Sequence, residues 1–189
     1  TLFRSSQEQS AVSDERARQF VEEIRELHFP PENIFNADQS GFTKEMHSAR
    51  TLAPRGIREV ICCVQSTSST THSYTVMPTI AANGRLCRKL FVVFKEPEGK
   101  FPRCFGPSMA SDLVLTAHSS HIMTKHLMLV WLKNCVLTDE MPDHLLLIVD
   151  SWTSFRDHVS MQSLVPEGKR LTIKNIPAGA TSDIQPLDR

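Results

Sequence analysis

The sequence predicts an α/β fold in which helices flank a mixed sheet, and two observations lead to this prediction. The first is a run of five aliphatic residues, Leu145–Val149, bounded by His144 and Asp150. An unbroken apolar run of that length is typical of a strand buried on both faces in the middle of an α/β sheet. The second is the order of the segments, which reads helix, three or four strands, helix, strand, helix, strand. The 189 residues show no linker, so we expect one domain.

The first predicted element is a helix that begins at Ser13. Residues 1–12 are polar, and we expect them to be flexible. From Ser13 onward the pattern becomes helical, because apolar residues recur at helical spacing (Ala17, Phe20, Val21, Ile24 and Leu27). Ser13 can cap this helix, and Pro30-Pro31 ends it.

Several strands are predicted next. A short strand over residues 33–38 runs into Gln39-Ser40-Gly41, which resembles a turn. Residues 58–65, 74–82 and 86–94 are rich in β-branched and apolar side chains, with Asn83-Gly84 as a turn between the last two. We expect these three segments to form an antiparallel meander.

The second half of the chain returns to alternating helices and strands. Residues 95–120 contain several prolines and glycines and no clear period, so we expect an irregular excursion there. Thr124 can cap a helix with an apolar face that includes Trp131, and this helix leads into the central strand. A helix over residues 155–165 and a strand over residues 170–176 should follow.

Composition excludes several classes of protein. Lys and Arg number 21, as do Asp and Glu, so the net charge of zero gives no overall electrostatic attraction to nucleic acid. The five cysteines are scattered and odd in number, which argues against a disulfide framework or a zinc ribbon and favours a reducing compartment. No apolar run approaches the roughly 20 residues that cross a membrane. A nucleophile elbow and a phosphate-binding glycine loop are also absent, which argues against hydrolases and kinases.

Two acids are the first candidates for a site. Asp38 and Asp150 each follow an apolar strand, and we expect these two strands to be neighbours in the sheet. Open α/β sheets bind ligands at the carboxyl ends of their strands, so both acids are placed where chemistry is expected. The alternative is that such an Asp only caps the next helix.

Three ordered motifs resemble the catalytic domain of pogo- and Tigger-type transposases, a branch of the DDE superfamily that is related to centromere protein B and the jerky proteins. The first motif is Asn36-Ala-Asp38-Gln-Ser-Gly-Phe42, and the second is the aliphatic strand that ends in Asp150. The third is the segment from Pro177 to Asp188, which ends in Gln-Pro-Leu-Asp. The resemblance covers nearly all of the chain from Ser13 onward.

The resemblance implies an RNase H-like domain over residues 13–189 that cleaves and joins DNA. Asp38, Asp150 and Asp188 would be the catalytic residues and the ligands of Mg²⁺ or Mn²⁺. Mg²⁺ takes oxygen ligands, and a pair of such ions can activate water and stabilise the departing 3′ oxygen of a phosphodiester. The implied partners are transposon ends and target DNA, with no membrane. A nuclear location is implied as well, and a homo-oligomer is allowed.

The chain departs from the family pattern in three places. Gln39 stands where the family has a second acid, and the candidate histidine His158 lies further from Asp150 than the family histidine does. Asp183 rivals Asp188 as the third acid, although motif alignment favours Asp188. The sequence ends at Arg189, where the family fold expects a closing helix, so we expect that helix to be missing. A domesticated, non-cleaving DNA-associated or protein-interaction module is therefore the alternative function.

Overall fold

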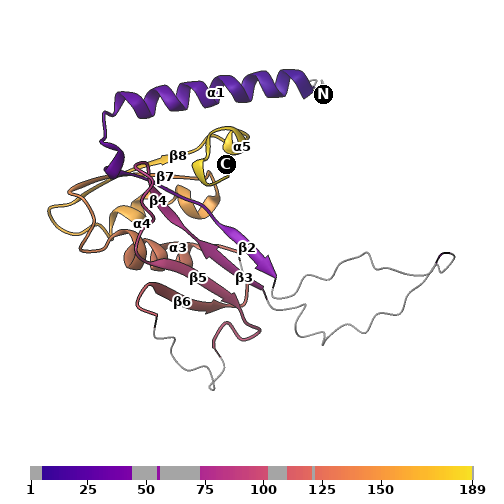
Figure 1. Cartoon of the computed structure of the whole chain (residues 1–189), viewed down its shortest axis with the longest axis vertical. Coiled ribbons are helices and arrows are strands. Elements are labelled where there is room, and N and C mark those ends of the chain that lie inside the picture. The colour runs from indigo at the N-terminus through magenta and orange to yellow at the C-terminus, as the bar shows by residue number, and fades with distance from the viewer. Residues whose placement is uncertain (1–5, 44–54, 56–72, 102–109, 121, 189) are drawn as a thin grey trace.

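The protein has a mixed α/β architecture, as the sequence predicts (Figure 1). The structure is a computed structural model that describes residues 6–43, 55, 73–101, 110–120 and 122–188. Its strands are β1 (Ile34–Ala37), β2 (Ser40–Thr43), β3 (Ser73–Met77), β4 (Thr79–Ala81), β5 (Leu90–Lys95), β6 (Leu113–His118), β7 (His144–Val149) and β8 (Arg170–Asn175). Its helices are α1 (Ser6–Glu26), α3 (Lys125–Trp131), α4 (His158–Gln162) and α5 (Thr181–Ile184), with shorter turns η1 (Pro31–Asn33), η2 (Leu132–Val136), η3 (Thr153–Arg156) and η4 (Pro186–Asp188).

The strands form two sheets of mixed direction. In the first, with the order β4-β1-β7-β8, β1 is antiparallel to β4 but parallel to β7, and β7 is parallel to β8. In the second, with the order β2-β3-β5-β6, the first three strands are antiparallel and β6 is parallel to β5. A meander of three antiparallel strands is therefore present, but its first strand is β2. The predicted strand over residues 58–65 lies outside the described residues.

One register runs through both sheets. Ala37 of β1 pairs with Thr79. Ser40 of β2, three residues later, pairs with Val76, three residues before Thr79, so the antiparallel register is the same in both sheets. The segments β1–β2 and β4–β3 are thus two long strands interrupted at the same level. Pro78 contributes to the interruption because it has no backbone N–H to donate. The combined sheet has the order β6-β5-β3/β4-β2/β1-β7-β8.

This register corrects the predicted turn at Gln39-Ser40-Gly41. The chain does not reverse there, because Ser40–Thr43 continues as β2 against β3. Gly41 is a turn residue in most contexts, but pairing with Thr75 holds it in extended backbone. Tertiary pairing therefore overrides the local turn preference at this position.

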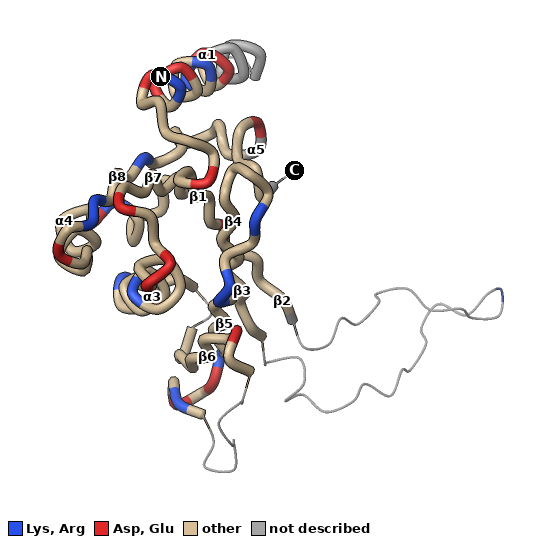
Figure 2. The backbone as a smooth tube through the Cα atoms, turned by 60° about the vertical axis from the view of Figure 1, so that its left-hand side comes forward, with Lys and Arg blue, Asp and Glu red and all other residues tan. Residues whose placement is uncertain are grey.

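Helices cover both faces of the first sheet. On one face, α3 and α4 contribute Leu127, Trp131 and Met161 to the main core, together with Leu147 and Val149 of β7. On the other face, α1 contributes Ala17 and Phe20 to a smaller core with Leu146, Ile148 and Ala180. Figure 1 and Figure 2 show α1 on one side of β7 and β8 and α3 on the other. Strand β7 is buried on both faces, which confirms the prediction from its aliphatic run.

The N-terminal helix is longer than predicted. Helix α1 begins at Ser6 instead of Ser13, so residues 6–12 are helical and the expected flexible segment is wrong over that range. These residues include Gln, Glu and Ala and contain neither Gly nor Pro, so nothing in them stops the helix. Ser13 is consequently inside the helix, and its hydroxyl donates instead to the carbonyl of Gly179, at 2.6 Å.

Three further predictions can be compared with the structure. Thr124 caps α3, accepting a hydrogen bond from the backbone N–H of Leu127 at 3.3 Å, and Trp131 is fully buried; both predictions are confirmed. The predicted irregular excursion over residues 95–120 is wrong for Leu113–His118, which forms β6. The predicted helix over residues 155–165 is broken into η3 and α4.

A membrane-crossing helix is absent from the described part of the chain, because each helix there is too short or too polar.

Candidate functional site

The two candidate acids follow adjacent parallel strands at the same level. Asn36 of β1 pairs with Ile148 of β7, and both strands then run on for one residue, to Ala37 and Val149. Asp38 and Asp150 are the next residues, each directly after the end of its strand. The expectation that the acids end neighbouring strands is confirmed.

Strand alternation places both acids on the same face of the sheet. In β7, Leu146 and Ile148 face the core beneath α1, so Asp150 continues that face. In β1, Ile34 packs on the same core, and two further alternations lead to Asp38. Both acids are half-buried. Asp38 and Asp150 thus follow the carboxyl ends of two parallel strands, and by strand alternation they lie on the face that α1 and α5 cover.

The C-terminal segment reaches the same edge. The hydroxyl of Thr181, the first residue of α5, lies 3.4 Å from Oδ1 of Asp150. The backbone N–H of Ser151 also donates to that oxygen. The next turn, η4, contacts β1. All three motifs of the sequence thus meet at one edge of the sheet, although they are spread from residue 36 to residue 188.

Asn175, which the sequence analysis missed, fixes the chain beyond Asp150. Its amide nitrogen donates to the carbonyl of Asp150, at 3.0 Å, and to the carbonyl of Phe155, at 3.1 Å. Its amide oxygen contacts Nε2 of His158 at 2.7 Å. One side chain at the end of β8 therefore holds both ends of the loop after Asp150. The sequence offered one signal for it, a polar residue at the carboxyl end of a predicted strand.

His158 belongs to this network and is separated from the acids. It contacts Asn175, and Asn175 in turn holds the backbone of Asp150, so His158 acts on the loop conformation. The resemblance of His158 to the family histidine stays a prediction.

The third acid has two candidates, Asp183 and Asp188, and the structure describes the side chain of Asp183 alone. Asp183 is exposed, in the first turn of α5, where its backbone N–H donates to the carbonyl of Ala180. Asp188 is the last residue of η4, and its side chain lies outside what the structure describes. Among the described residues, no group of three or more His, Cys, Asp or Glu side chains is arranged to hold a metal ion.

Buried polar atoms without partners mark the same edge. Gln185 is fully buried, and within the described residues neither atom of its side-chain amide has a hydrogen-bond partner. Asn36 is also buried; its amide nitrogen donates to the carbonyl of Ile148 at 3.1 Å, but Oδ1 has no such partner. A buried polar atom that stays unpaired costs about 1–3 kcal/mol, so such atoms usually meet water, an ion or a ligand.

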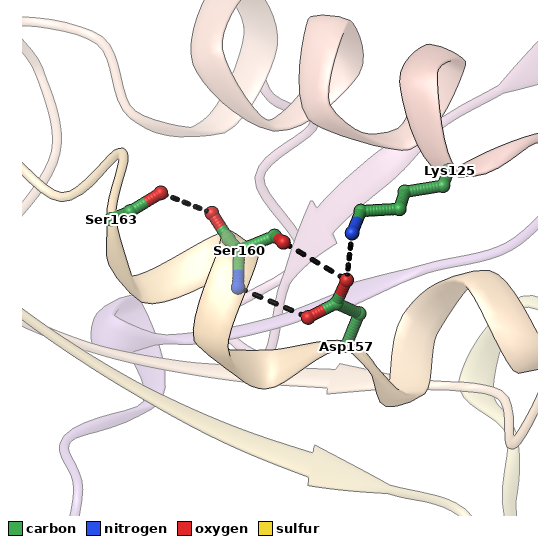
Figure 3. A network of polar contacts seen from close by, with 4 residues as sticks. All are labelled: Lys125, Asp157, Ser160 and Ser163. Atoms are coloured by element: carbon green, nitrogen blue, oxygen red, sulfur yellow. Dashed lines mark hydrogen bonds and ion pairs between the residues drawn. The ribbon is translucent and has the colours of Figure 1, made fainter.

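A separate polar network joins α3 to the start of α4 (Figure 3). Asp157 caps α4 by accepting hydrogen bonds from the N–H and hydroxyl of Ser160, and it forms an ion pair with Lys125. The hydrogen bond from Lys125 and those from Ser160 lower the pKa of Asp157 from 3.8 to about 2. This charge is committed to holding two helices together, so Asp157 is not a candidate ligand.

A cavity lies away from the acids. It has a volume of about 340 Å³, and its walls include Phe35, Cys87, Lys89 and Cys135. Phe35 is near the start of β1, so the cavity is at the opposite end of the strand from Asp38. Burial raises the pKa of the Cys135 thiol to about 12, which keeps it protonated and weakly nucleophilic at neutral pH.

Two lysines near the end of the chain form ion pairs. Lys169 contacts Asp143 at 3.1 Å, and Lys174 contacts Glu23 of α1 at 3.1 Å. Both pairs hold elements of the fold together.

Comparison with protein-family models, with curated proteins and with solved structures gives no significant match for this chain.

Proposed function

We propose that the chain is a metal-dependent DNA endonuclease domain of the DDE type, and that it derives from a pogo- or Tigger-like transposase. The observation that carries the proposal is the parallel pairing of β1 and β7, because Asp38 and Asp150 directly follow the carboxyl ends of these two neighbouring strands. Two carboxylates on one face at one strand edge form an oxygen-rich site of the kind that Mg²⁺ or Mn²⁺ prefers.

The surroundings of Asp150 fit a metal ligand. Within the described residues, the hydrogen bonds to its carboxylate both involve Oδ1, from Ser151 and Thr181, which leaves Oδ2 for an external cation. The unpaired amide atoms of Asn36 and Gln185 could accept from or donate to the water shell of that cation. Asp38 and Asp150 would hold the ion, with Asp188 or Asp183 as the third acid.

The chemistry of such a site is phosphodiester cleavage. A bound divalent cation would supply an activated water and would stabilise charge on the departing 3′ oxygen. The contribution of the chain is positional: β1 and β7 hold the carboxylates, while Thr181 and Ser151 orient the carboxylate of Asp150. DNA is the proposed substrate, with a nuclear location as the family resemblance implies.

The strand order supports an RNase H-like fold. In chain order, the long strand β1–β2 is the first, β3–β4 the second, β5 the third, β7 the fourth and β8 the fifth, with β6 added beside β5. The family fold carries its first acid on the first strand, the second on the fourth and the third after the fifth. On this proposal, Asp38, Asp150 and the segment from Thr181 to Asp188 would be the counterparts of those acids, since they follow β1, β7 and β8 in chain order.

A non-cleaving module is the second candidate. It is favoured by Gln39 in place of the second family acid. Such a protein would keep the fold and its DNA or protein partners, and it would have lost the chemistry.

Nicking of supercoiled plasmid DNA in Mn²⁺ tests the proposal. The wild-type chain should nick DNA, and Asp38→Asn and Asp150→Asn should each reduce nicking to background. Asp143→Asn is the matched control, because Asp143 precedes β7 at the opposite end of the same strand. Metal binding without nicking in any variant would favour the non-cleaving module. Nicking that persists in Asp150→Asn would contradict the assignment.

A further inference from the structure

The two tryptophans of the chain have opposite environments. Trp131 is fully buried, and its indole N–H lies 3.3 Å from the hydroxyl of Thr79. Trp152 is 49% exposed, although it follows Asp150 by only two residues. Among the described residues no aromatic ring contacts Trp152, whereas the other strongly exposed aromatic residue, Phe42, stacks on Tyr74 with ring centres 5.3 Å apart. Trp152 therefore presents an exposed ring on the loop that directly follows Asp150.

The loop that carries Trp152 is held at both ends. Asn175 binds the carbonyls of Asp150 and Phe155, and Arg156 donates to the carbonyl of Ser151 at 2.7 Å. Side chains with fixed backbones lose less conformational entropy on binding than those on free loops. An indole on such a loop can accept a flat partner at low entropic cost.

The neighbouring side chains match a nucleotide. Arg156 is exposed and cationic, and Ser151 and Thr153 carry hydroxyl groups. Guanidinium and hydroxyl groups are common donors to phosphate oxygens, and an exposed indole is a favourable stacking surface for an unpaired base. A protein partner would also fit an exposed Trp, but the adjacent guanidinium and hydroxyl donors favour a nucleic acid.

We propose that Trp152 stacks on an unpaired DNA base next to the phosphodiester at the Asp38–Asp150 site. This inference rests on the proposed function and adds a substrate contact to it. Trp152 would position the strand, and it would take no part in bond breaking. Stacking on one base should strengthen binding roughly fivefold to a hundredfold.

Binding of labelled DNA without metal tests the contact separately from catalysis. The probes are a duplex with single-stranded 3′ tails and a blunt duplex of the same paired sequence, both with EDTA present. The wild-type chain should prefer the tailed probe, and Trp152→Ala should bind it roughly fivefold to a hundredfold more weakly. Trp152→Phe should retain most of the preference. The control is Leu86→Ala, since Leu86 is 58% exposed and bridges Ile80 on the side of β4 that faces away from β1 and β7.

Intrinsic fluorescence gives a second reading of the same contact. The tailed probe should quench the wild-type emission, and quenching should vanish in Trp152→Phe, in which only the buried Trp131 emits. Tailed-probe affinity unchanged in Trp152→Ala would overturn the proposal. So would self-association that Trp152→Ala abolishes in the absence of any DNA binding, because Trp152 would then lie in an interface between copies. Absence of metal binding or nicking would overturn the proposed function, but DNA binding in EDTA would still test whether Trp152 stacks on a base.

Discussion

At the scale of single residues, Asn175 connects the two halves of the candidate site. It stands at the end of β8, and its amide group contacts the backbone on both sides of Trp152 as well as His158. Asn175 matters without being a ligand, because its hydrogen bonds fix the path of the backbone after Asp150. Its partners become known only when β7 and β8 are paired, so a sequence pattern alone could not assign this role.

Replacing Asn175 with Ala should destabilise the fold and loosen the site. The change leaves two half-buried carbonyls and a histidine without their partner, at a cost of about 1–3 kcal/mol. Urea unfolding measures the loss. The control is Asn134→Ala, which removes one hydrogen bond to Val130 within a helix, and its cost should be smaller. Equal losses in the two variants would contradict the bridging role.

The identity of the third acid can be decided by a comparison of two variants. If Asp188 is the ligand, as the Gln-Pro-Leu-Asp motif implies, Asp188→Asn should weaken Mn²⁺ binding more than Asp183→Asn does. Asp183 is exposed at the start of α5, where an acid also interacts favourably with the helix N-terminus. Calorimetric titration with Mn²⁺ measures both affinities. A larger effect of Asp183→Asn would reverse the assignment.

At the scale of elements, strongly patterned segments were predictable and context-dependent ones were not. The aliphatic run of β7 and the capped face of α3 fixed their elements locally. Strand β6 was missed because it exists through its parallel pairing with β5. The same reason explains β2, whose Ser-Gly start resembles a turn until β3 is placed beside it. Pairing over long sequence distances is invisible to a local pattern.

The junction between α3 and α4 should respond to acid. Its carboxylate, Asp157, has a pKa of about 2 in the folded protein against 3.8 as the ordinary value. A carboxylate whose pKa is lower in the folded protein than in the unfolded chain stabilises the fold at any pH above its unfolded pKa. This stabilisation is lost as pH falls from about 4 to about 2. Asp157→Asn keeps an N-cap side chain and removes the charge.

Urea midpoints of wild type and Asp157→Asn measured between pH 5 and pH 2 check this prediction. Wild type should be more stable at pH 5, and the difference should shrink toward pH 2. A difference that stays constant across the range would show that ionisation of Asp157 does not contribute.

Helix α1 should hold the segment that carries the third motif. Ser13 donates to Gly179 across 166 residues, and Ala17 packs with Ala180. Ser13→Ala favours the helix itself but removes this bond, so overall stability should change little. Hydrogen exchange over residues 177–184 should become faster. Gln19→Ala is the control, because Gln19 bonds only to Glu15 within the helix. Unchanged exchange in Ser13→Ala would show that packing alone anchors the segment.

At the scale of the whole molecule, two sheets that share one register place distant motifs together. The paired strands are interrupted at Asp38 and Pro78, and the carboxyl end of β7 lies beside this interruption because β7 pairs with β1. The sequence predicted that Asp38 and Asp150 end neighbouring strands, since each follows an apolar segment. It could not predict Thr181 beside Asp150 or the buried amide of Gln185, because these depend on how α5 and η4 fold back over the sheet.

Thermal unfolding with and without Mg²⁺ or Mn²⁺ tests the central claim, that Asp38 and Asp150 together bind a divalent cation. A ligand that binds only the folded state stabilises it by RT ln(1 + [L]/Kd), so the measurement reports binding even without DNA cleavage. The melting temperature of wild type should rise with metal. The rise should disappear in Asp38→Asn and in Asp150→Asn, and it should persist in Asp143→Asn. Equal melting temperatures with and without metal, or a rise that survives both substitutions, would contradict the account.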